Sequence, residues 1–265
     1  MTSSAVVWLS LTGLVSGVLA GFLGIGGGTL LVPVLVQLGF EAVGATATSS
    51  LAILVTASAG SFQNWRMGYL NIQPVLLLGA SAVVTAFLAT FIGDRIPDYI
   101  LLAGFATLLI SNLYLVSLKK RVIRTAQFRQ SRTATGPAIN PVTARIATGA
   151  TAGFMAGLFG VGGGVILVPM QILLLGEQIK PAVRNSLGVI VITSIAASVG
   201  HAINGNIHLL AGLILGCGGL IGVQVSTRFL PKMSDSAVTQ MFRAMLVILS
   251  IYIFWQAWQA YQLAT

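Results

Sequence analysis

Two glycine runs and a small set of polar side chains are the groups in this chain that could bind a ligand. A run of three glycines breaks a helix, since each glycine costs about 1 kcal/mol there and permits a sharp turn. The helix that follows begins with unpaired N–H groups and a partial positive charge, and such an end binds anions. The residues are Gly26, Gly27, Gly28 and Thr29 at the first run and Gly162, Gly163 and Gly164 at the second.

A second group of candidates consists of the polar side chains in the apolar segments that follow each glycine run. Hydroxyl and amide groups can donate hydrogen bonds to an oxyanion, and an indole can line the wall of a path. A histidine can change its charge near neutral pH and so act as a proton-coupling group, with a structural role at a helix interface as the alternative. The candidates are Thr48, Ser49, Ser50, Asn64, Trp65, Asn185, Ser186 and His201.

Simpler roles compete with these assignments. Glycines spaced four apart precede both runs and predict tight helix packing, because small residues let two helix backbones approach closely. Serine and threonine in membrane helices also bond back to their own backbone, which would leave them without a ligand. The two packing ladders are Gly13, Gly17 and Gly21, and Gly149, Gly153 and Gly157.

The composition identifies a membrane protein. Hydrophobic residues make up 56% of the 265 residues, charged residues make up 7%, and the mean hydropathy is +0.94. Soluble domains carry about 25% charged residues, so this chain could not cover the surface of a water-soluble fold. We therefore expect an all-α membrane protein whose surface lies mostly in lipid.

The histidines, the cysteine and the glycine runs argue against a metal site, a disulfide and a nucleotide-binding site. His201 and His208 lie seven residues apart without a carboxylate near them in sequence, and Cys217 is the only cysteine, so we expect neither a metal site nor an intrachain disulfide. The glycine runs lack the rest of a dinucleotide-binding or P-loop motif. We expect no catalytic residues, no cofactor and no enzymatic activity; a membrane enzyme would have to rely on His201 and the hydroxyl groups.

The chain is a duplicated unit. With a shift of 136 residues, 17–33 pairs with 153–169 at ten identical positions out of 17, and Ser50 pairs with Ser186. Such self-similarity predicts two copies of one structural unit. Glycine, proline and charged residues divide each copy into five apolar segments, which we expect to be helices. The segments are 5–23, 28–39, 44–64, 72–92 and 98–118, and then 144–159, 164–176, 184–203, 207–228 and 236–261.

The positions of lysine and arginine predict the orientation in the membrane. Seven of the 14 fall in the acid-free stretch 119–145, and basic loops stay on the cytoplasmic side. If each copy crosses five times, only Arg95 lies in an outer loop and only Arg243 lies within a segment. An odd number of crossings makes the copies inverted, with both termini outside, and inverted repeats are typical of transporters. The predicted parts are a first repeat, 1–118, a cytoplasmic loop, 119–143, and a second repeat, 144–265.

The second segment of each copy is short for a crossing. Twelve residues form about 18 Å of helix, whereas the hydrocarbon layer is about 30 Å thick. The glycine runs should therefore lie at depth in the bilayer. Because the copies are inverted, we expect the N-termini of the two short helices to converge near the midplane, where irregular backbone must line a cavity or be buried in protein.

The paired segments GFLGIGGGTLLVP and GLFGVGGGVILVP resemble the TauE/SafE family of sulfite and organosulfonate exporters, and the resemblance extends over nearly the whole chain. The stretches 47–51 and 185–187 also resemble that family. The resemblance implies a bacterial inner-membrane permease for sulfite, sulfoacetate, thiosulfate or a related sulfur oxyanion. One copy has Gln63-Asn64-Trp65-Arg66 where the other has Gly200-His201-Ala202-Ile203, so we expect the side-chain contacts to be asymmetric.

We therefore expect a secondary transporter of a small anion that works by alternating access of its two halves. Its partners would be the anion and the lipid bilayer, with coupling to a proton or another ion left open. An anion channel and a membrane scaffold without transport activity are the alternatives. We expect no nucleic-acid binding by the basic stretch, since Phe128 is the only aromatic residue interleaved with it.

Overall fold

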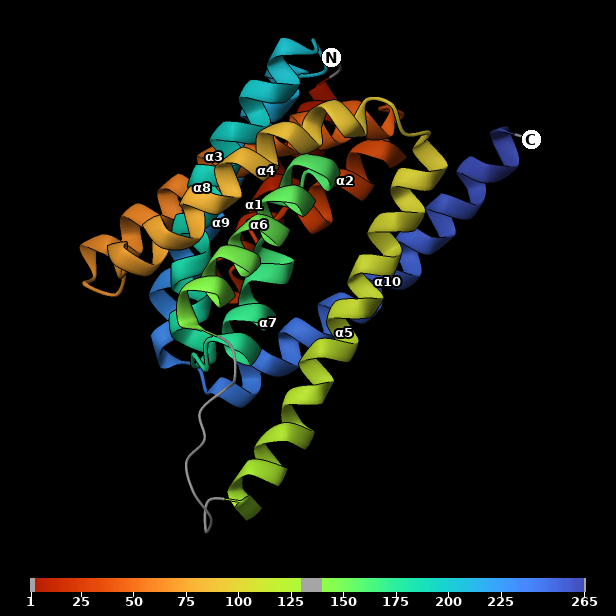
Figure 1. The fold of residues 1–265 in the computed structure, drawn as a ribbon. Coiled ribbons are helices and arrows are strands. Elements are labelled where there is room, and N and C mark those ends of the chain that lie inside the picture. Colours follow the sequence, from red (N-terminus) through yellow and green to blue (C-terminus); the bar gives the residue numbers. More distant parts are fainter. Residues whose placement is uncertain (1–2, 130–139, 265) are drawn as a thin grey trace.

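The fold is a bundle of helices that follow one another in two similar sets of five (Figure 1). The computed structural model describes residues 3–129 and 140–264, and within those ranges it contains ten α-helices, one 3-10 turn and no strand. The first set is α1 (Ser3–Leu23), α2 (Gly28–Gln37), α3 (Ala42–Arg66), α4 (Ile72–Gly93) and α5 (Asp98–Arg129). The second set is α6 (Pro141–Phe159), α7 (Gly164–Leu174), α8 (Ile179–Ile203), α9 (Leu209–Phe229) and α10 (Asp235–Ala264), with the turn η1 (Leu230–Lys232) before α10.

The ten expected segments are confirmed as helices, and two of their ends lie far from the expected positions. α8 begins five residues early, because Pro181 is tolerated in the first turn of a helix. α5 continues to Arg129, because lysine and arginine end an apolar segment without disfavouring a helix. Residues 119–129 are therefore helical and not part of a loop, while 130–139 of the predicted loop lie outside the described residues.

The register of the repeat changes once along the chain. The glycines that precede α2 and α7 are 136 residues apart, whereas Gly39 and Gly176, which have positive φ after those helices, are 137 apart. One residue is therefore inserted near the end of α7, which has 11 residues where α2 has 10. From that point Ser49 corresponds to Ser186, and the expected pairing of Ser50 with Ser186 is wrong.

Each short helix folds back along the long helix before it. Gly27, at the start of α2, lies against Ser16, whose Oγ donates a hydrogen bond to the Gly27 carbonyl oxygen at 3.0 Å. At the other end of α2, Leu38 lines a cavity together with Ala5 from the start of α1. The pair α1–α2 is thus a hairpin that starts and ends at the same end of the bundle. In the pair α6–α7, the residue before α7 likewise lies against the middle of α6.

This hairpin corrects the expectation that the short helix of the first copy crosses to the other side. Ten residues span about 15 Å, so α2 brings the chain from the middle of the bundle back to the end from which α1 starts. The third, fourth and fifth helices then carry the chain between the two ends. The first half therefore crosses between the two ends three times. Three crossings are an odd number, like the five that were expected, so the predicted membrane side of each charged loop does not change.

Helices α3 and α8 run antiparallel through the centre of the bundle. Near the start of α3, Thr46 lies against Gly160, and halfway along, Ile53 and Ile190 both lie against the glycine turn that precedes α2. Just after the end of α3, Tyr69 faces the guanidinium of Arg184, which is near the start of α8. The fifth helices are antiparallel as well, since α5 descends in Figure 1 while α10 ascends beside it.

The two glycine ladders are confirmed as helix-packing surfaces. A Cβ added to Gly17 in α1 would collide with the backbone of Gly219 in α9, and one added to Gly153 in α6 would collide with the carbonyl oxygen of Ala82 in α4. Thr85 Oγ1 adds an interhelical hydrogen bond to the Ala150 carbonyl oxygen at 2.8 Å. The first helix of each set therefore packs on the fourth helix of the other set, which interlocks the two halves.

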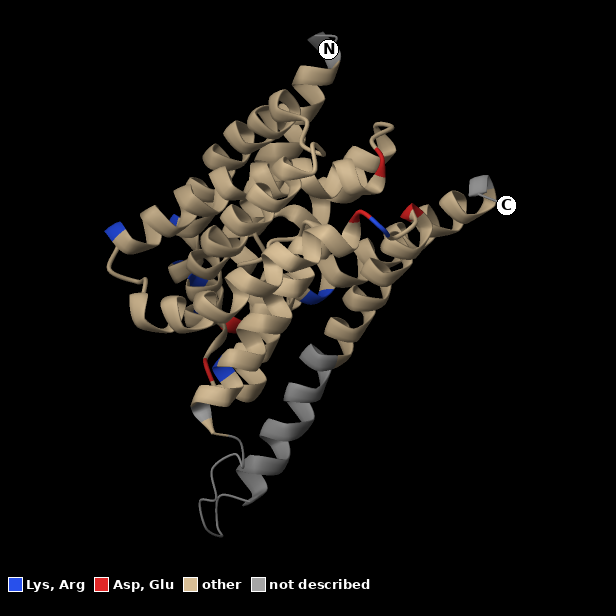
Figure 2. Ribbon diagram, turned by 45° about the horizontal axis from the view of Figure 1, so that its top comes forward, with Lys and Arg blue, Asp and Glu red and all other residues tan. Residues whose placement is uncertain are grey.

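The outer surface of the bundle is apolar along much of its length. Six helices in the described part of the chain are long and apolar enough to cross a membrane, namely α1, α3, α4, α8, α9 and α10. Large apolar side chains such as Trp8 and Ile251 are more than 60% exposed. Charged residues are sparse and lie mostly at helix ends and in connections (Figure 2). A surface of this kind suits a lipid bilayer.

The interlocking contact predicts a specific sensitivity to added volume. Gly17→Ala forces a methyl group into the α9 backbone and should destabilise the protein by about 1–3 kcal/mol, the usual cost of overpacking. Gly93→Ala is the matched control, because its Cβ would lie 3.7 Å from Leu158 Cδ1, an ordinary van der Waals contact. Melting temperatures of the purified proteins should fall for the first variant and not for the second; equal melting temperatures would contradict the packing role of Gly17.

Candidate functional site

The two glycine turns meet in the interior of the bundle. A Cβ on Gly28 would collide with the carbonyl oxygen of Gly160, and a Cβ on Gly164 would collide with the carbonyl oxygen of Gly24. Every residue from 24 to 28 and from 160 to 164 is buried. The starts of α2 and α7 thus lie next to each other, each against the turn that precedes the other. This close approach is the arrangement expected from the sequence, although its depth in a bilayer remains a prediction.

The backbone of both turns depends on glycine. Three glycines in each turn have φ between 62° and 87°, a region that side chains with a Cβ rarely occupy. In α2 the first helical hydrogen bond runs from the Leu30 N–H to the Gly27 carbonyl oxygen at 3.0 Å. The N–H groups of Gly28 and Thr29 precede that bond and stand at the positive end of the helix. α7 begins in the same way after Gly163.

Three hydroxyl groups hold the carbonyl oxygens of the turns. Ser49 Oγ donates to Gly160 at 2.8 Å, Ser16 Oγ donates to Gly27, and Thr193 Oγ1 donates to Gly162 at 3.1 Å. Each bond satisfies a buried acceptor in a stretch without regular secondary structure. Ser16 and Thr193 were not among the sequence candidates, because they lie 11 and 31 residues from their acceptors and no local pattern connects them.

Thr29 presents a hydroxyl group at the start of α2. Its side chain is fully buried, and within the described residues its Oγ1 has no hydrogen-bond partner. The same holds for Oγ1 of Thr46, which lies against Gly160. A buried hydroxyl without a partner costs about 1–3 kcal/mol, and a ligand that accepts a hydrogen bond from either group would offset that cost.

The other hydroxyl candidates serve the protein itself. Thr48 Oγ1 accepts a hydrogen bond from the backbone N–H of His208, and Ser50 Oγ donates to the Thr46 carbonyl oxygen one turn earlier. Ser186 Oγ accepts from Gln171 Nε2 at 2.8 Å, so the buried Gln171 of α7 is a neighbour that the sequence did not single out. The Ser50 bond lies within α3, whereas the other two join different elements: Thr48 of α3 with His208 at the start of α9, and Gln171 of α7 with Ser186 of α8.

Asn185 lies in the second turn of α8, and its side chain contacts the connection before that helix. Its Nδ2 donates to Oε2 of Glu177 at 3.4 Å. Burial raises the pKa of the Glu177 carboxyl, while the hydrogen bond from Asn185 and the charge of Arg145 lower it by smaller amounts. The carboxyl lies between α7 and α8, where the second hairpin ends. It is a half-buried acid beside a polar amide.

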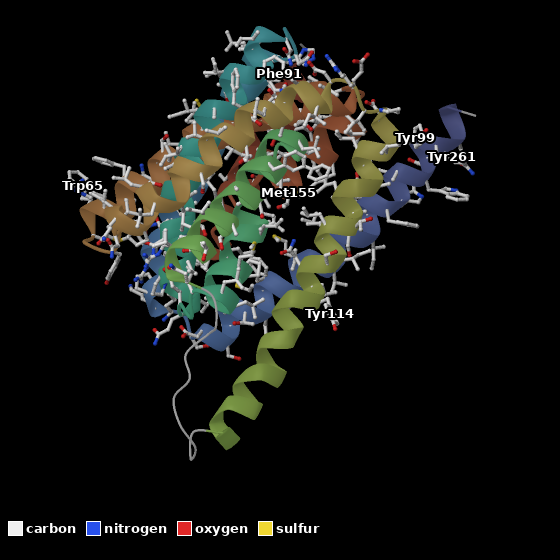
Figure 3. All side chains as sticks on the ribbon, viewed as in Figure 1. Trp65, Phe91, Tyr99, Tyr114, Met155 and Tyr261 are labelled. Carbon is white, nitrogen blue, oxygen red and sulfur yellow. The ribbon has the colours of Figure 1, made fainter. Side chains whose placement is uncertain are left out.

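Asn64 and His201 occupy equivalent positions, and Trp65 lies outside the site. Asn64 is fully buried, and its side-chain oxygen and nitrogen have no hydrogen-bond partner among the described residues. His201 Nε2 lies 3.1 Å from the Gly157 carbonyl oxygen. Both are ten residues beyond the central residues of α3 and α8, or about 15 Å along each helix. Trp65 is 57% exposed at the far end of α3 (Figure 3).

The comparison with known proteins identifies the family. The family model described as "Sulfite exporter TauE/SafE" matches residues 9–253. The chain belongs to the TauE/SafE family. A protein of Bacillus subtilis named "Probable membrane transporter protein YunE" is 27% identical over 94% of this chain and 97% of its own length. A "Probable membrane transporter protein" of Xylella fastidiosa is 26% identical over 96% of this chain and 97% of its own length. No solved structure matches the chain.

This TauE/SafE protein is therefore a multi-pass membrane protein of a transporter family. Among the basic residues whose side chains the structure describes, all except Arg95 and Arg243 gather at one end of the bundle, where α3 ends and α8 begins. Lys180 Nζ pairs there with Asp235 at 3.4 Å and donates to the Pro231 carbonyl oxygen, and Arg184 lies over Tyr69. The basic residues of these helix ends are Arg66, Arg145, Lys180, Arg184, Arg228 and Lys232.

The described residues contain no group of three or more histidine, cysteine or acidic side chains that could hold a metal ion.

Two cavities of about 440 and 370 Å³ lie away from the contact of the glycine turns. The smaller one lies between α5, α6 and α7 and reaches Phe159 and Ile166, which flank the second turn. The glycine turns themselves are closed to solvent in this TauE/SafE protein.

The raised pKa of Glu177 predicts a stability that depends on pH. An acid whose pKa is higher in the folded protein stabilises the fold while it is protonated, and this contribution is lost as the pH rises through the raised pKa. Glu177→Gln retains an acceptor for Asn185 without the charge. It should melt above wild type at mildly alkaline pH, and the difference should shrink as the pH falls toward the ordinary value of 4.5.

The melting temperatures of both proteins across that pH range test this prediction. Glu41→Gln, which removes an exposed carboxylate from the equivalent connection of the first hairpin, controls for the loss of one charge. A difference between wild type and Glu177→Gln that stays constant over the whole range would show that burial of Glu177 does not govern its protonation.

Proposed function

We propose that this protein is a secondary transporter that moves a small sulfur-containing anion, such as sulfite or an organosulfonate, and that the anion binds between the two glycine turns. The observation that carries the proposal is the contact of the two turns, which brings two helix N-termini to one buried place. Backbone N–H groups and helix dipoles can stabilise an anion there without a fixed positive charge.

The chemistry of the turns fits an oxyanion. The N–H groups of Gly28 and Thr29 and the Thr29 hydroxyl are donors, and Thr46 adds a second free hydroxyl. Sulfite and sulfonate groups have several oxygens that accept hydrogen bonds, and a buried site of low dielectric strengthens such bonds. The family's description as sulfite exporters supports the same substrate class.

Alternating access is the mechanism that the architecture favours. The antiparallel course of α3 and α8 supports two halves that are inverted across the membrane, and inverted halves can rock about a central site. Full burial of both turns speaks against a continuously open anion channel. In a bacterial inner membrane, the basic end of the bundle would face the cytoplasm, and both termini would lie outside. In transport coupled to a proton, His201 and Glu177 are the side chains that would bind and release it.

Flux and ligand-induced stabilisation test the proposed function. Purified protein in proteoliposomes should accumulate labelled sulfite, thiosulfate or sulfoacetate on one side when the unlabelled anion is loaded on the other, and chloride should not compete. In thermal-shift assays, a bound anion at 100 times its Kd should stabilise the protein by about 2.7 kcal/mol. Absence of both flux and stabilisation for all three anions would refute the proposal.

Thr29→Val tests the placement of the site. Valine has nearly the shape of threonine, and it removes a buried hydroxyl that has no partner among the described residues, so the protein without ligand should be as stable as wild type or more stable. The loss of one hydrogen bond to a charged group should weaken anion binding by about 10–100-fold.

Thr148→Val is the matched control for this substitution. Thr148 is equally buried in α6, and its Oγ1 bonds to the Ala144 carbonyl oxygen of its own helix. Anion titrations followed by melting temperature should give the wild-type Kd for this variant. If Thr29→Val also kept the wild-type Kd, the anion would bind elsewhere.

A further inference from the structure

Two isoleucines lie against both glycine turns. A Cβ added to Gly26 would lie 3.0 Å from Ile53 Cγ2 and 3.1 Å from Ile190 Cγ2. A Cβ added to Gly162, in the other turn, would lie 2.9 Å from Ile190 Cγ2 and 3.1 Å from Ile53 Cγ2. The same two methyl groups therefore touch both turns.

The pair reproduces the symmetry of the fold. Ile53 and Ile190 are 137 residues apart, which is the register of α3 and α8, so each is the other's equivalent. The Cδ1 atom of Ile53 lies beside Gly28, and the Cδ1 atom of Ile190 lies beside Gly164. Both side chains are fully buried. Each half of the protein thus contributes one apolar side chain that lies against the first residue of its own short helix.

Polar groups lie along the same helices on either side of this apolar contact. Toward the end of α3 these are Ser61 and Asn64, and toward the end of α8 they are Ser198 and His201. All four are buried, and each carries at least one side-chain atom without a hydrogen-bond partner in the described part of the chain. Residues three apart share one helix face. Because α3 and α8 are antiparallel, these two polar faces lie on opposite sides of the central isoleucines, one toward each end of the bundle.

From this arrangement we propose that Ile53 and Ile190 form a gate that seals the anion site between the glycine turns from both ends of the bundle, and that the side chains must separate before an anion can reach Thr29. The inference rests on the proposed function, since a gate needs a site to close. An apolar seal excludes water and ions because a charged group without hydrogen bonds is strongly disfavoured between methyl groups.

Labelling of a cysteine behind the seal tests the gate without knowledge of the substrate. Thr29→Cys in a Cys217→Ala background places one thiol at the start of α2. The probe is the anionic reagent 2-sulfonatoethyl methanethiosulfonate, added to protein in nanodiscs. The thiol should react slowly while both isoleucines are present. With Ile53→Ala and Ile190→Ala together, labelling should be at least about tenfold faster, because truncation of two buried isoleucines strongly destabilises the closed packing.

Leu246→Ala is the control for general loosening of the protein. Leu246 is fully buried in α10, whereas the two isoleucines belong to α3 and α8, and its truncation also creates a cavity. The labelling rate in this background should stay near that of the sealed protein. If the double isoleucine variant does not yield folded protein, Ile53→Val and Ile190→Val, which each remove one methyl group, should give a smaller acceleration in the same assay.

The outcomes separate the gate from the proposed function. Equal labelling rates with and without the isoleucines, or equal acceleration by Leu246→Ala, would overturn the gate even if wild type transports sulfite. Faster labelling only in the isoleucine variants would support the gate even if wild type moves none of the tested anions, and the transport proposal alone would then fail.

Discussion

The structure depends on backbone contacts that leave no room for a Cβ atom. At Gly28 and Gly164 the missing side chain is replaced by a carbonyl oxygen of the opposite turn, and along the ladders of α1 and α6 it is replaced by the backbone of α9 and α4. Association of helices in lipid depends on close packing and not on exclusion of water. Glycine at these positions is therefore what lets the two halves interlock and what brings two helix ends to one point.

Irregular backbone inside a membrane protein must be satisfied by groups of the protein itself. The turns meet this requirement with hydroxyl groups from three different helices, which accounts for the carbonyl oxygens of Gly27, Gly160 and Gly162. The N–H groups at the starts of α2 and α7 are of the opposite polarity and are not used by these hydroxyls. Satisfied acceptors beside available donors are the electrostatic basis of the proposed anion site, even though the surrounding helices carry almost no charge.

The backbone framework is similar in the two halves, whereas the polar side chains differ. Glycine turns, ladders and the central isoleucines recur in both halves, so the mechanical framework is duplicated. The polar residues differ: Thr29 corresponds to Val165, and Asn64 corresponds to His201. Rocking of two equivalent halves requires similar packing on both sides, whereas recognition of one anion in one orientation requires different contacts on each side.

The sequence by itself determined the helices, the duplication, the two breaks and the membrane class, because hydropathy and glycine runs act locally. It also gave Thr29 and Ser49 among its candidates; the structure places both at the turns, and their role in binding stays a prediction. Only the tertiary structure decided that α2 folds back beside α1, that the register shifts by one residue, that Trp65 faces outward, and that Ser16, Thr193, Ile53 and Ile190 surround the turns. The contacts of these side chains with the turns join residues from 11 to 164 positions apart, and contacts at such separations follow from helix packing, which no local pattern records.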